Sequence, residues 1–521
     1  MKTKHNTRIG LIATIFLLSF TISCTKLDQK VYSVVPDQDF WQTPDQIAAG
    51  IAPAYQALTG IPDGDMFELN ESSGGEMIVP TRGSDWYDNG GHQQMWTHTW
   101  KPDFGTLDGI WGTIFNGIGK ANFTLNAVNS LATPPPGLDN INAELKVLRA
   151  YYYYWAMDMF GQVPVVTDFN TDPTTINNNM SRKDIFNFIE KEIKDNMNLL
   201  PDKTVASYGH MTHWGAWMLL AKMYLNAQVY TETTPGNPST GTARWADCIA
   251  ACDSVINSKK YSLSTSYFDN FAINNEGSNE NIFVVPFDKV NIGGMNWEMQ
   301  TLHYQSNLTF NLSGSPWNGF CSKADYYNQF DSADKRKSQF LVGQQYASDG
   351  ITPLKDNQTN LLLKFSPYVN QLSNSADSFR LAGVRSVKYA PQAGTAGNQS
   401  NDMVLFRLAD AYLMRAEAKV RSNTDLAGAL DDINKIRERA YGDANHDWTL
   451  ADLTLPNIYA ERQREMSWEG WSRQDAIRFG TFGDARNPDK AKDPSDGHLE
   501  IFPIPSPRIS ANPNLKQNPG Y

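Results

Sequence analysis

The segment 404–441, VLFRLADAYLMRAEAKVRSNTDLAGALDDINKIRERAY, places the strongest limit on how this chain can fold. Apolar and small residues recur at helical spacing in two runs, with a polar break at 422–424. Small side chains at Ala409, Ala416 and Ala429 allow two helix backbones to approach closely, as in helix-turn-helix repeats of the tetratricopeptide kind. Because a single hairpin of this type cannot bury its apolar face, the chain must supply further helices.

Helical periodicity also occurs earlier in the chain. A helix is predicted from Thr43 to Leu58, with Pro44 in its first turn, where proline is tolerated. The last three of the following helices begin about thirty residues apart, which is looser than a regular tetratricopeptide array. We therefore predict a mainly α fold, an irregular array of tetratricopeptide-like helical hairpins. The further predicted helices are 110–129, 141–160, 182–200, 212–230 and 244–257.

Two segments lack helical period and interrupt the array. The first is rich in Gly, Asp, Asn and aromatic residues, and the second contains short strand-like pieces at 282–286 and 361–365. Long loops of this kind usually carry function. The predicted organisation is an N-terminal region at 43–290 with a loop layer at 59–105, a loop-rich insertion with short strands at 291–403, and a C-terminal region at 404–521 that packs on the N-terminal helices.

The N-terminus has the pattern of an export signal. Positive charges precede an apolar run at 9–20, which is shorter than the roughly 20 residues of a membrane span. Cys24 directly follows Ser23, as the lipidated cysteine does in bacterial lipoprotein signals. We expect a signal peptide at 1–23, lipidation at Cys24 and a tether at 24–42, with ordinary signal cleavage nearby as the alternative.

Composition excludes some classes of function. The 45 basic and 56 acidic residues give a net charge of −11, which argues against binding to nucleic acid. Besides Cys24, only Cys248, Cys252 and Cys321 are present, too few for a disulfide framework. Cys248 and Cys252 lie one helical turn apart without further metal ligands, so they are interpreted as core residues. No metal or other cofactor is predicted.

Five segments, in order, resemble the SusD/RagB family of surface glycan-binding lipoproteins of Bacteroidetes. The last two are the most specific: ERQREMSWEGWSRQDAIRFG at 461–480 and IFPIPSPRISANPNLKQNPGY at 501–521. Ser472 and Ala476 depart from the family, in which Arg and Leu are frequent at these positions. The other three segments are 145–166, 209–227 and the hairpin at 404–441.

The resemblance implies a mostly helical fold with four tetratricopeptide-like units beside a loop-rich half that binds ligand. It also implies an outer-membrane lipoprotein that faces the cell exterior. Its implied partner is a SusC-like TonB-dependent barrel, over which the protein would sit as a hinged lid and deliver oligosaccharide.

A sugar presents apolar C–H faces and hydroxyl edges, so its binding surface needs flat aromatic side chains together with polar ones. Both loop regions contain such residues beside turn-forming residues, and family members place their glycan-binding aromatics in these regions. Trp86, Trp297 and Trp317 match best. For Trp96, within MWTHTW, a half-buried strand with core packing is the favoured interpretation. The candidate ligand contacts are Arg82, Asp85, Trp86, Trp96, Trp297, Tyr304, Trp317, Asn318 and Arg385.

An enzyme is one alternative to a glycan receptor. Glu465, Glu469 and Arg473 are spaced one turn apart, which favours a structural ion-pair ladder on one helix. A glycosidase needs two carboxylates across a cleft, and the first loop layer could supply them, but no local hydrolase motif is present. We therefore predict a non-catalytic protein. The acidic residues concerned are Asp63, Asp65, Glu68 and Asp85.

The alternative from another class is a helical-repeat lipoprotein that binds peptide or protein cargo, with its loop aromatics buried. Exposed tryptophans in the two loop regions would favour glycan. The predicted function is a lipid-anchored outer-membrane glycan receptor that works with a barrel transporter.

Overall fold

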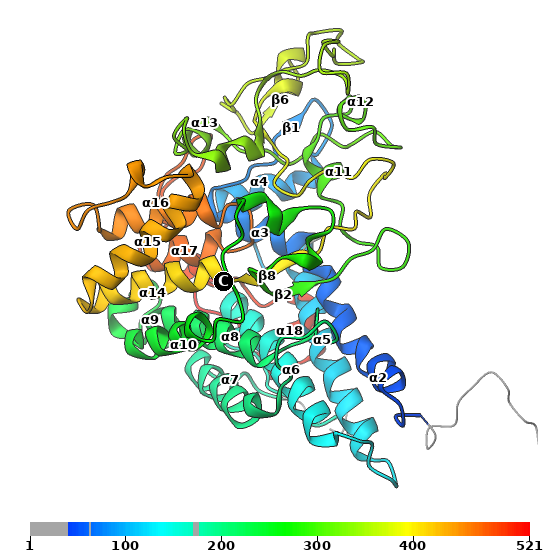
Figure 1. Cartoon of the computed structure of the whole chain (residues 1–521), viewed down its shortest axis with the longest axis vertical. Coiled ribbons are helices and arrows are strands. Elements are labelled where there is room, and N and C mark those ends of the chain that lie inside the picture. The colour runs from blue at the N-terminus through cyan, green and yellow to red at the C-terminus, as the bar shows by residue number, and fades with distance from the viewer. Residues whose placement is uncertain (1–39, 62–63, 170–176) are drawn as a thin grey trace, which may run out of the picture.

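The computed structural model describes residues 40–61, 64–169 and 177–521. The predicted signal peptide at 1–23, Cys24, most of the tether and Asp63 lie outside these residues. Within the described ranges, no helix has the length and apolar character needed to cross a membrane. Figure 1 shows two unlike halves, with packed helices in the lower and left parts and loops with short elements at the top.

The helical half begins with α2 (Pro44–Gln56). Thr43 caps this helix, because its hydroxyl accepts from the Gln46 N–H at 3.3 Å while the Gln46 side chain accepts from the Thr43 N–H at 3.0 Å. Consecutive helices pack side by side, and their positions confirm the predicted series. The following helices are α5 (Gly105–Asn129), α6 (Leu138–Phe160), α7 (Arg182–Asn196), α8 (His213–Leu225), α9 (Ala227–Tyr230) and α10 (Trp245–Asn257).

The C-terminal hairpin consists of α14 (Leu408–Ser422) and α15 (Leu426–Tyr441). It packs on α10 and α8, so helices from both sides of the loop-rich segment form one body, as predicted. The hairpin does not begin at residue 404. Met403–Arg407 forms β8, which pairs antiparallel with β2 (Asn281–Val285), and every residue of both strands is buried.

Close packing of α5 against α6 depends on a glycine. A β-carbon at Gly117 would overlap the Tyr152 ring, and the Tyr152 hydroxyl continues past it to donate to the Ala54 carbonyl at 2.6 Å. The tyrosines from 151 to 154 are at most 1% exposed. This aromatic run, which forms part of the family resemblance, therefore belongs to the core. Cys248 and Cys252 are also buried and unpaired, as predicted.

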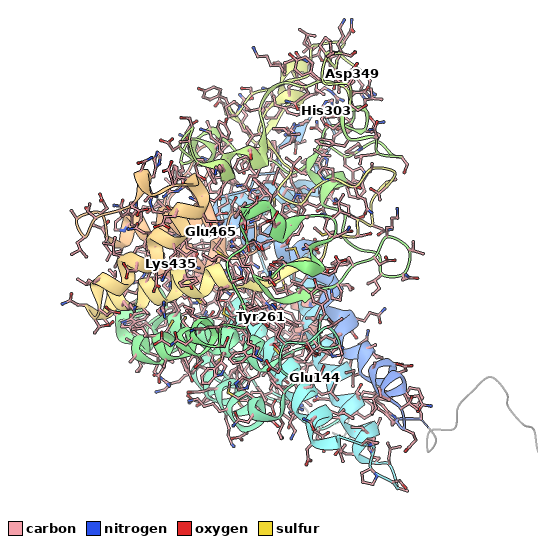
Figure 2. All side chains as sticks on the ribbon, viewed as in Figure 1. Glu144, Tyr261, His303, Asp349, Lys435 and Glu465 are labelled. Atoms are coloured by element: carbon pink, nitrogen blue, oxygen red, sulfur yellow. The ribbon has the colours of Figure 1, made fainter. Side chains whose placement is uncertain are left out.

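The predicted ion-pair ladder on a single helix is wrong, although structural ion pairing is confirmed. α16 (Leu455–Glu465) ends before Glu469, and α17 (Ser472–Arg478) begins after it. The three residues therefore have separate partners. Glu465 lies where the C-terminal helices meet the loop-rich half (Figure 2) and accepts from Arg407 at 2.5 Å. Glu469 pairs with Arg407 and Lys388, and Arg473 pairs with Asp158.

The loop-rich half contains only short elements. The first loop layer is less irregular than predicted, because it includes α3 (Asp65–Gly74), which packs against α17. β1 (Thr81–Arg82) pairs in parallel with β6 (Ser373–Asn374). The remaining elements are α4 (Gly91–Thr97), α11 (Trp297–Thr301), α12 (Asn307–Phe310), α13 (Ala324–Tyr327), β3 (Phe340–Leu341), β4 (Gly343–Gln344), β5 (Lys364–Phe365), β7 (Arg385–Ser386) and, at the C-terminus, α18 (Ser506–Ala511).

Candidate functional site

Four of the predicted ligand contacts meet at one open pocket in the loop-rich half. Asp85 and Trp86 come from the first loop region, and Tyr304 and Trp317 come from the second. The pocket has a volume of about 500 Å³ and is completed by Asp88, Ser315 and Pro316. We call it the aromatic pocket. It joins two parts of the chain that are far apart in sequence.

A tight turn after β1 positions Trp86. The Arg82 N–H donates to the Asp85 carbonyl at 3.0 Å and the Asp85 N–H returns to the Arg82 carbonyl at 3.1 Å. Trp86 then adopts a left-handed backbone conformation, with φ of 61°. Its indole Nε1 donates to the Trp317 carbonyl at 2.7 Å, and a β-carbon at Gly319 would overlap its ring. Both constraints hold the indole against the second loop region.

The aromatic faces differ in exposure. Trp317 is 42% exposed, although its backbone N–H is fixed on the Met299 carbonyl at 2.7 Å. Trp86 is half-buried against Phe320 and His92, and neighbouring Tyr87 is 54% exposed. Large aromatic side chains exposed on a fixed backbone are available for stacking with a ligand.

Polar groups stand beside these rings. The Tyr304 hydroxyl donates to Asp85 Oδ2 at 2.5 Å, and the Arg380 guanidinium lies 4.8 Å from the Tyr304 ring centroid and 3.7 Å from the same oxygen. Burial, followed by hydrogen bonding to Asp85, raises the pKa of Tyr304 to about 12, so this hydroxyl stays protonated. The Asp85 side chain remains 42% exposed and can accept hydrogen bonds from ligand hydroxyls.

Arg380 is held from behind by a buried pair. Its Nε donates to Asp356 Oδ2 at 3.0 Å, and His303 Nε2 lies 2.9 Å from the same oxygen. Burial lowers the pKa of His303 to about 4, so the ring is neutral at pH 7 and donates to the carboxylate. Figure 2 places His303 in the upper, loop-rich part of the molecule.

Three predicted contacts lie beneath the pocket instead of lining it. Arg82, Asn318 and Arg385 are at most 1% exposed. Arg385 Nη2 donates to Asn318 Oδ1 at 2.7 Å, Arg82 Nη1 donates to the Asn318 carbonyl at 3.0 Å, and Asn318 Nδ2 donates to the Arg380 carbonyl at 3.0 Å. Their polar atoms are buried and bonded to the loops that carry the pocket. The prediction that these three residues touch ligand is therefore wrong in this structure. We call them the pocket floor.

The charge of the floor is unusual. Within the described part of the chain, neither Arg82 nor Arg385 has a carboxylate at ion-pair distance, and both donate mainly to backbone carbonyls, including that of Ala382 at 2.8 Å. Burial, followed by repulsion from Arg82, lowers the pKa of Arg385 to about 9. The floor therefore positions loops that lack regular secondary structure.

Trp297 and Trp96 are core residues. Trp297 begins α11 at 3% exposure, and its ring centroid lies 4.8 Å from Tyr389 and 5.5 Å from Trp468. The prediction that Trp297 contacts ligand is wrong, because its ring is buried against aromatic residues that are distant in the sequence. Trp96 is 1% exposed and donates to the Pro488 carbonyl at 2.7 Å. Core packing at Trp96 is confirmed, but the expected strand is the helix α4.

Arg380 is not predicted from the sequence, and neither are the lining residues Asp88 and Ser315. Arg380 lies in the 3-10 helix Asp377–Leu381, where no spacing marks it as part of a site. As to metals, the described residues contain no group of three or more His, Cys, Asp and Glu side chains arranged to hold an ion.

Two family models match this chain. The model described as the SusD family matches residues 279–521, and the model described as "Starch-binding associating with outer membrane" matches residues 27–225. The chain belongs to the SusD/RagB family. The SusD/RagB matches thus include both segments that contribute to the aromatic pocket.

Two SusD relatives are similar to this chain over most of their length. The starch-binding protein SusD of Bacteroides thetaiotaomicron is 25% identical over 483 residues, which cover 84% of this chain and 82% of the relative. A SusD-like protein of Bacteroides ovatus is 24% identical, covering 90% of this chain and 82% of the relative.

Solved structures of the SusD superfamily share the fold. A laminarin-binding SusD-like protein superposes with a TM-score of 0.72 at 20% identity, covering 92% of this chain and all of that one. Surface glycan-binding protein A from Bacteroides thetaiotaomicron in complex with laminarihexaose gives 0.69 at 19% identity, covering 92% and 100% of the two chains.

Proposed function

We propose that this protein is a non-catalytic receptor for oligo- or polysaccharide and that the aromatic pocket is its binding site. The observation that carries the proposal is the convergence of exposed Trp317, half-buried Trp86 and the Tyr304–Asp85 pair on one open hollow. Relatives described as binding starch or laminarin support this ligand class. A site for an entirely apolar ligand would not need Asp85 at its rim.

The pocket suits sugar recognition in two ways. The indole faces can stack on C–H faces, each contact contributing on the order of 1 kcal/mol. Asp85 and the neighbouring Tyr304 hydroxyl can exchange hydrogen bonds with ring hydroxyls. Because the pocket is open, a polymer longer than the pocket can extend beyond it, as a surface receptor requires.

The carboxylates do not favour catalysis. A glycosidase places its two carboxyl groups on opposite sides of the scissile bond. The two that line this pocket, Asp85 and Asp88, belong to the same turn, and Asp88 is paired with His92 at 2.8 Å. They would therefore meet a sugar from one side.

Location and partner form the second part of the proposal. We infer lipid anchorage at Cys24, an outward orientation at the outer membrane, and delivery of ligand to a SusC-like TonB-dependent barrel under this protein as a lid. The signal-like sequence before Cys24 and the outer-membrane association in the matched family description support this proposal.

Calorimetric titration of residues 25–521 against plant, host-mucin and microbial polysaccharides tests the ligand class. One or more glycans should bind, and Trp317→Ala and Trp86→Ala should each weaken binding by roughly tenfold. Phe123→Ala, which removes a 54% exposed ring on α5, is the matched control and should have no effect. If peptides bind while no glycan does, the alternative of a peptide-cargo receptor replaces this proposal.

A further inference from the structure

A second hollow lies beside the aromatic pocket. It has a volume of about 870 Å³ and is bounded by the turn at 88–91, α4 and the segment leading into α5. Its lining includes Asp88, which also lines the aromatic pocket. The two hollows therefore adjoin at this residue.

Two aromatic side chains in contact, with their rings tilted at 54°, lie between the two hollows. Trp86 lines the aromatic pocket, His92 lines the second hollow, and their ring centroids are 5.3 Å apart. His92 is 8% exposed and is held by Glu68 on one nitrogen and Asp88 on the other. Tyr87 lies between Trp86 and Asp88 in the chain and presents a 54% exposed ring. The turn at which the two hollows adjoin therefore carries an exposed aromatic side chain.

The turn that carries Tyr87 has a constrained backbone. Trp86, Asp88 and Asn89 have φ values of 61°, 38° and 51°, which residues other than glycine adopt rarely. The Gly90 N–H closes the turn on the Tyr87 carbonyl at 2.6 Å, and the His92–Asp88 pair anchors it from the side of the second hollow. The turn that supports Trp86 in the aromatic pocket thus also lines the second hollow.

The second hollow has the mixture of groups that a sugar needs. Half-buried Phe104 supplies an apolar wall. Its ring lies against Gly91, because a β-carbon added at that glycine would be 3.6 Å from the ring. Gln94, Lys101 and Asp103 supply donors and acceptors around it. Three lining carboxylates, those of Asp65, Asp88 and Asp103, face two lining cations, Lys101 and a protonated His92. An added anionic group is therefore disfavoured.

We propose that the second hollow is a further glycan subsite, so that the protein selects neutral oligosaccharides long enough to cross the Tyr87 turn. This inference rests on the proposed function, because it extends the same ligand. A disaccharide would fill the aromatic pocket alone, whereas a hexasaccharide would occupy both hollows and gain contacts with Phe104 and Gln94.

Titration with glycans of two lengths tests the inference. The probes are neutral hexasaccharides, laminarihexaose and maltohexaose among them, the matching disaccharides, and hexagalacturonate as the anionic chain. Phe104→Ala should weaken hexasaccharide binding roughly fivefold and leave disaccharide binding unchanged. Trp317→Ala should weaken both. Gln94→Ala, a milder change on α4, should act in the same direction as Phe104→Ala, and Phe123→Ala is again the control.

Each outcome has a distinct meaning. If Trp317→Ala weakens binding while Phe104→Ala and Gln94→Ala leave hexasaccharide affinity intact, the second subsite is disproved and the proposed function stands. Tighter binding of hexagalacturonate than of neutral chains would overturn the selection of neutral chains and leave the proposed function standing. If no neutral hexasaccharide binds, the second subsite is disproved, and the polysaccharide titration described above decides the proposed function. Urea denaturation of each variant establishes that the fold is retained.

Discussion

The helical half and the pocket floor of the loop-rich half bury arginines in different ways. In the helical half, Arg462 lies between Asp410 at 3.0 Å and Asp475 at 2.9 Å, so the buried cation is neutralised by two helices. In the loop-rich half, Arg82 and Arg385 donate to carbonyls and to the Asn318 amide. Helices satisfy their own backbone groups and use arginine to join one another. Irregular loops leave carbonyls unpaired, and buried guanidinium groups satisfy them.

This difference explains how loops can carry exposed aromatic side chains. Where buried arginines already hold the loop backbone in place, the other side chains of the loop do not have to pack inward to keep its shape. Trp317 is 42% exposed directly before Asn318, which is fully buried in the pocket floor. The loop-rich half can therefore present aromatic side chains outward without collapsing around them.

The largest expected effect is the loss of an ion pair in the helical half. Arg462→Met leaves two buried carboxylates short of a partner and should lower the free energy of unfolding by about 3–5 kcal/mol, as measured by urea denaturation. Lys191→Met removes one member of the exposed pair with Asp195 and should change it by less than about 0.5 kcal/mol. Equal effects of the two substitutions would contradict the structural role assigned to the buried charges.

Two tryptophans of the loop-rich half should behave in opposite ways. Trp297→Ala removes a ring packed on Phe67, Tyr389 and Trp468 and should destabilise the protein by about 3–5 kcal/mol. Trp317→Ala should change stability by less than about 0.5 kcal/mol while weakening glycan binding. Comparing denaturation midpoints with calorimetry separates the two effects. A stable Trp297→Ala variant that loses ligand would restore Trp297 as a contact.

The stabilisation of the turn at 86–92 should depend on pH. Burial disfavours the charged His92 ring, but Glu68 and Asp88 outweigh it and raise its pKa to about 9. Because this lies above the unfolded value, the stabilisation is complete below about pH 6.5 and is lost as pH rises through about 9. Denaturation of wild type and His92→Gln should differ by about 3 kcal/mol at pH 6, and the difference should shrink by pH 9. A constant difference would show that the ion pairs do not stabilise the turn.

A moderate loss of stability should follow a substitution in the pocket floor. Asn318→Ala removes the acceptor of Arg385 and the donor to the Arg380 carbonyl, and should cost about 1–3 kcal/mol. Its effect on glycan affinity should exceed that of Phe123→Ala, because the chain at Trp317 loses its support. Calorimetry on the folded variant measures this effect. Unchanged affinity would mean that the loops hold their shape without the floor.

Helical positions were predictable because their signal is local. The spacing of Ala409, Ala416 and Ala429 depends only on neighbours in the chain, and α14 and α15 lie close to where it placed them. The errors at Val404 and Glu469 have the same origin. Both residues continue the spacing of the neighbouring helix, although Val404 lies in β8 and Glu469 lies beyond the end of α16. Spacing alone therefore does not show where a helix begins or ends.

The site was only partly predictable because burial in loops depends on distant residues. Trp297 and Trp317 both stand beside turn-forming residues in the sequence. One meets Phe67 and Trp468 from other segments, whereas the other meets solvent. Likewise, Arg82 and Arg385 are separated by the helices from α5 to α10 and by most of the insertion, and they come together under Asn318 only in the folded chain.

The bond from the Trp86 indole to the Trp317 carbonyl joins residues 231 positions apart. It fixes the Trp86 ring against the backbone that carries Trp317, so the spacing of the two residues is set before any ligand arrives. Polysaccharides with different linkages differ in pitch and curvature, and under the proposed function a fixed spacing would match only some of them. Altering this one contact would then change the ligand preference while both rings are kept.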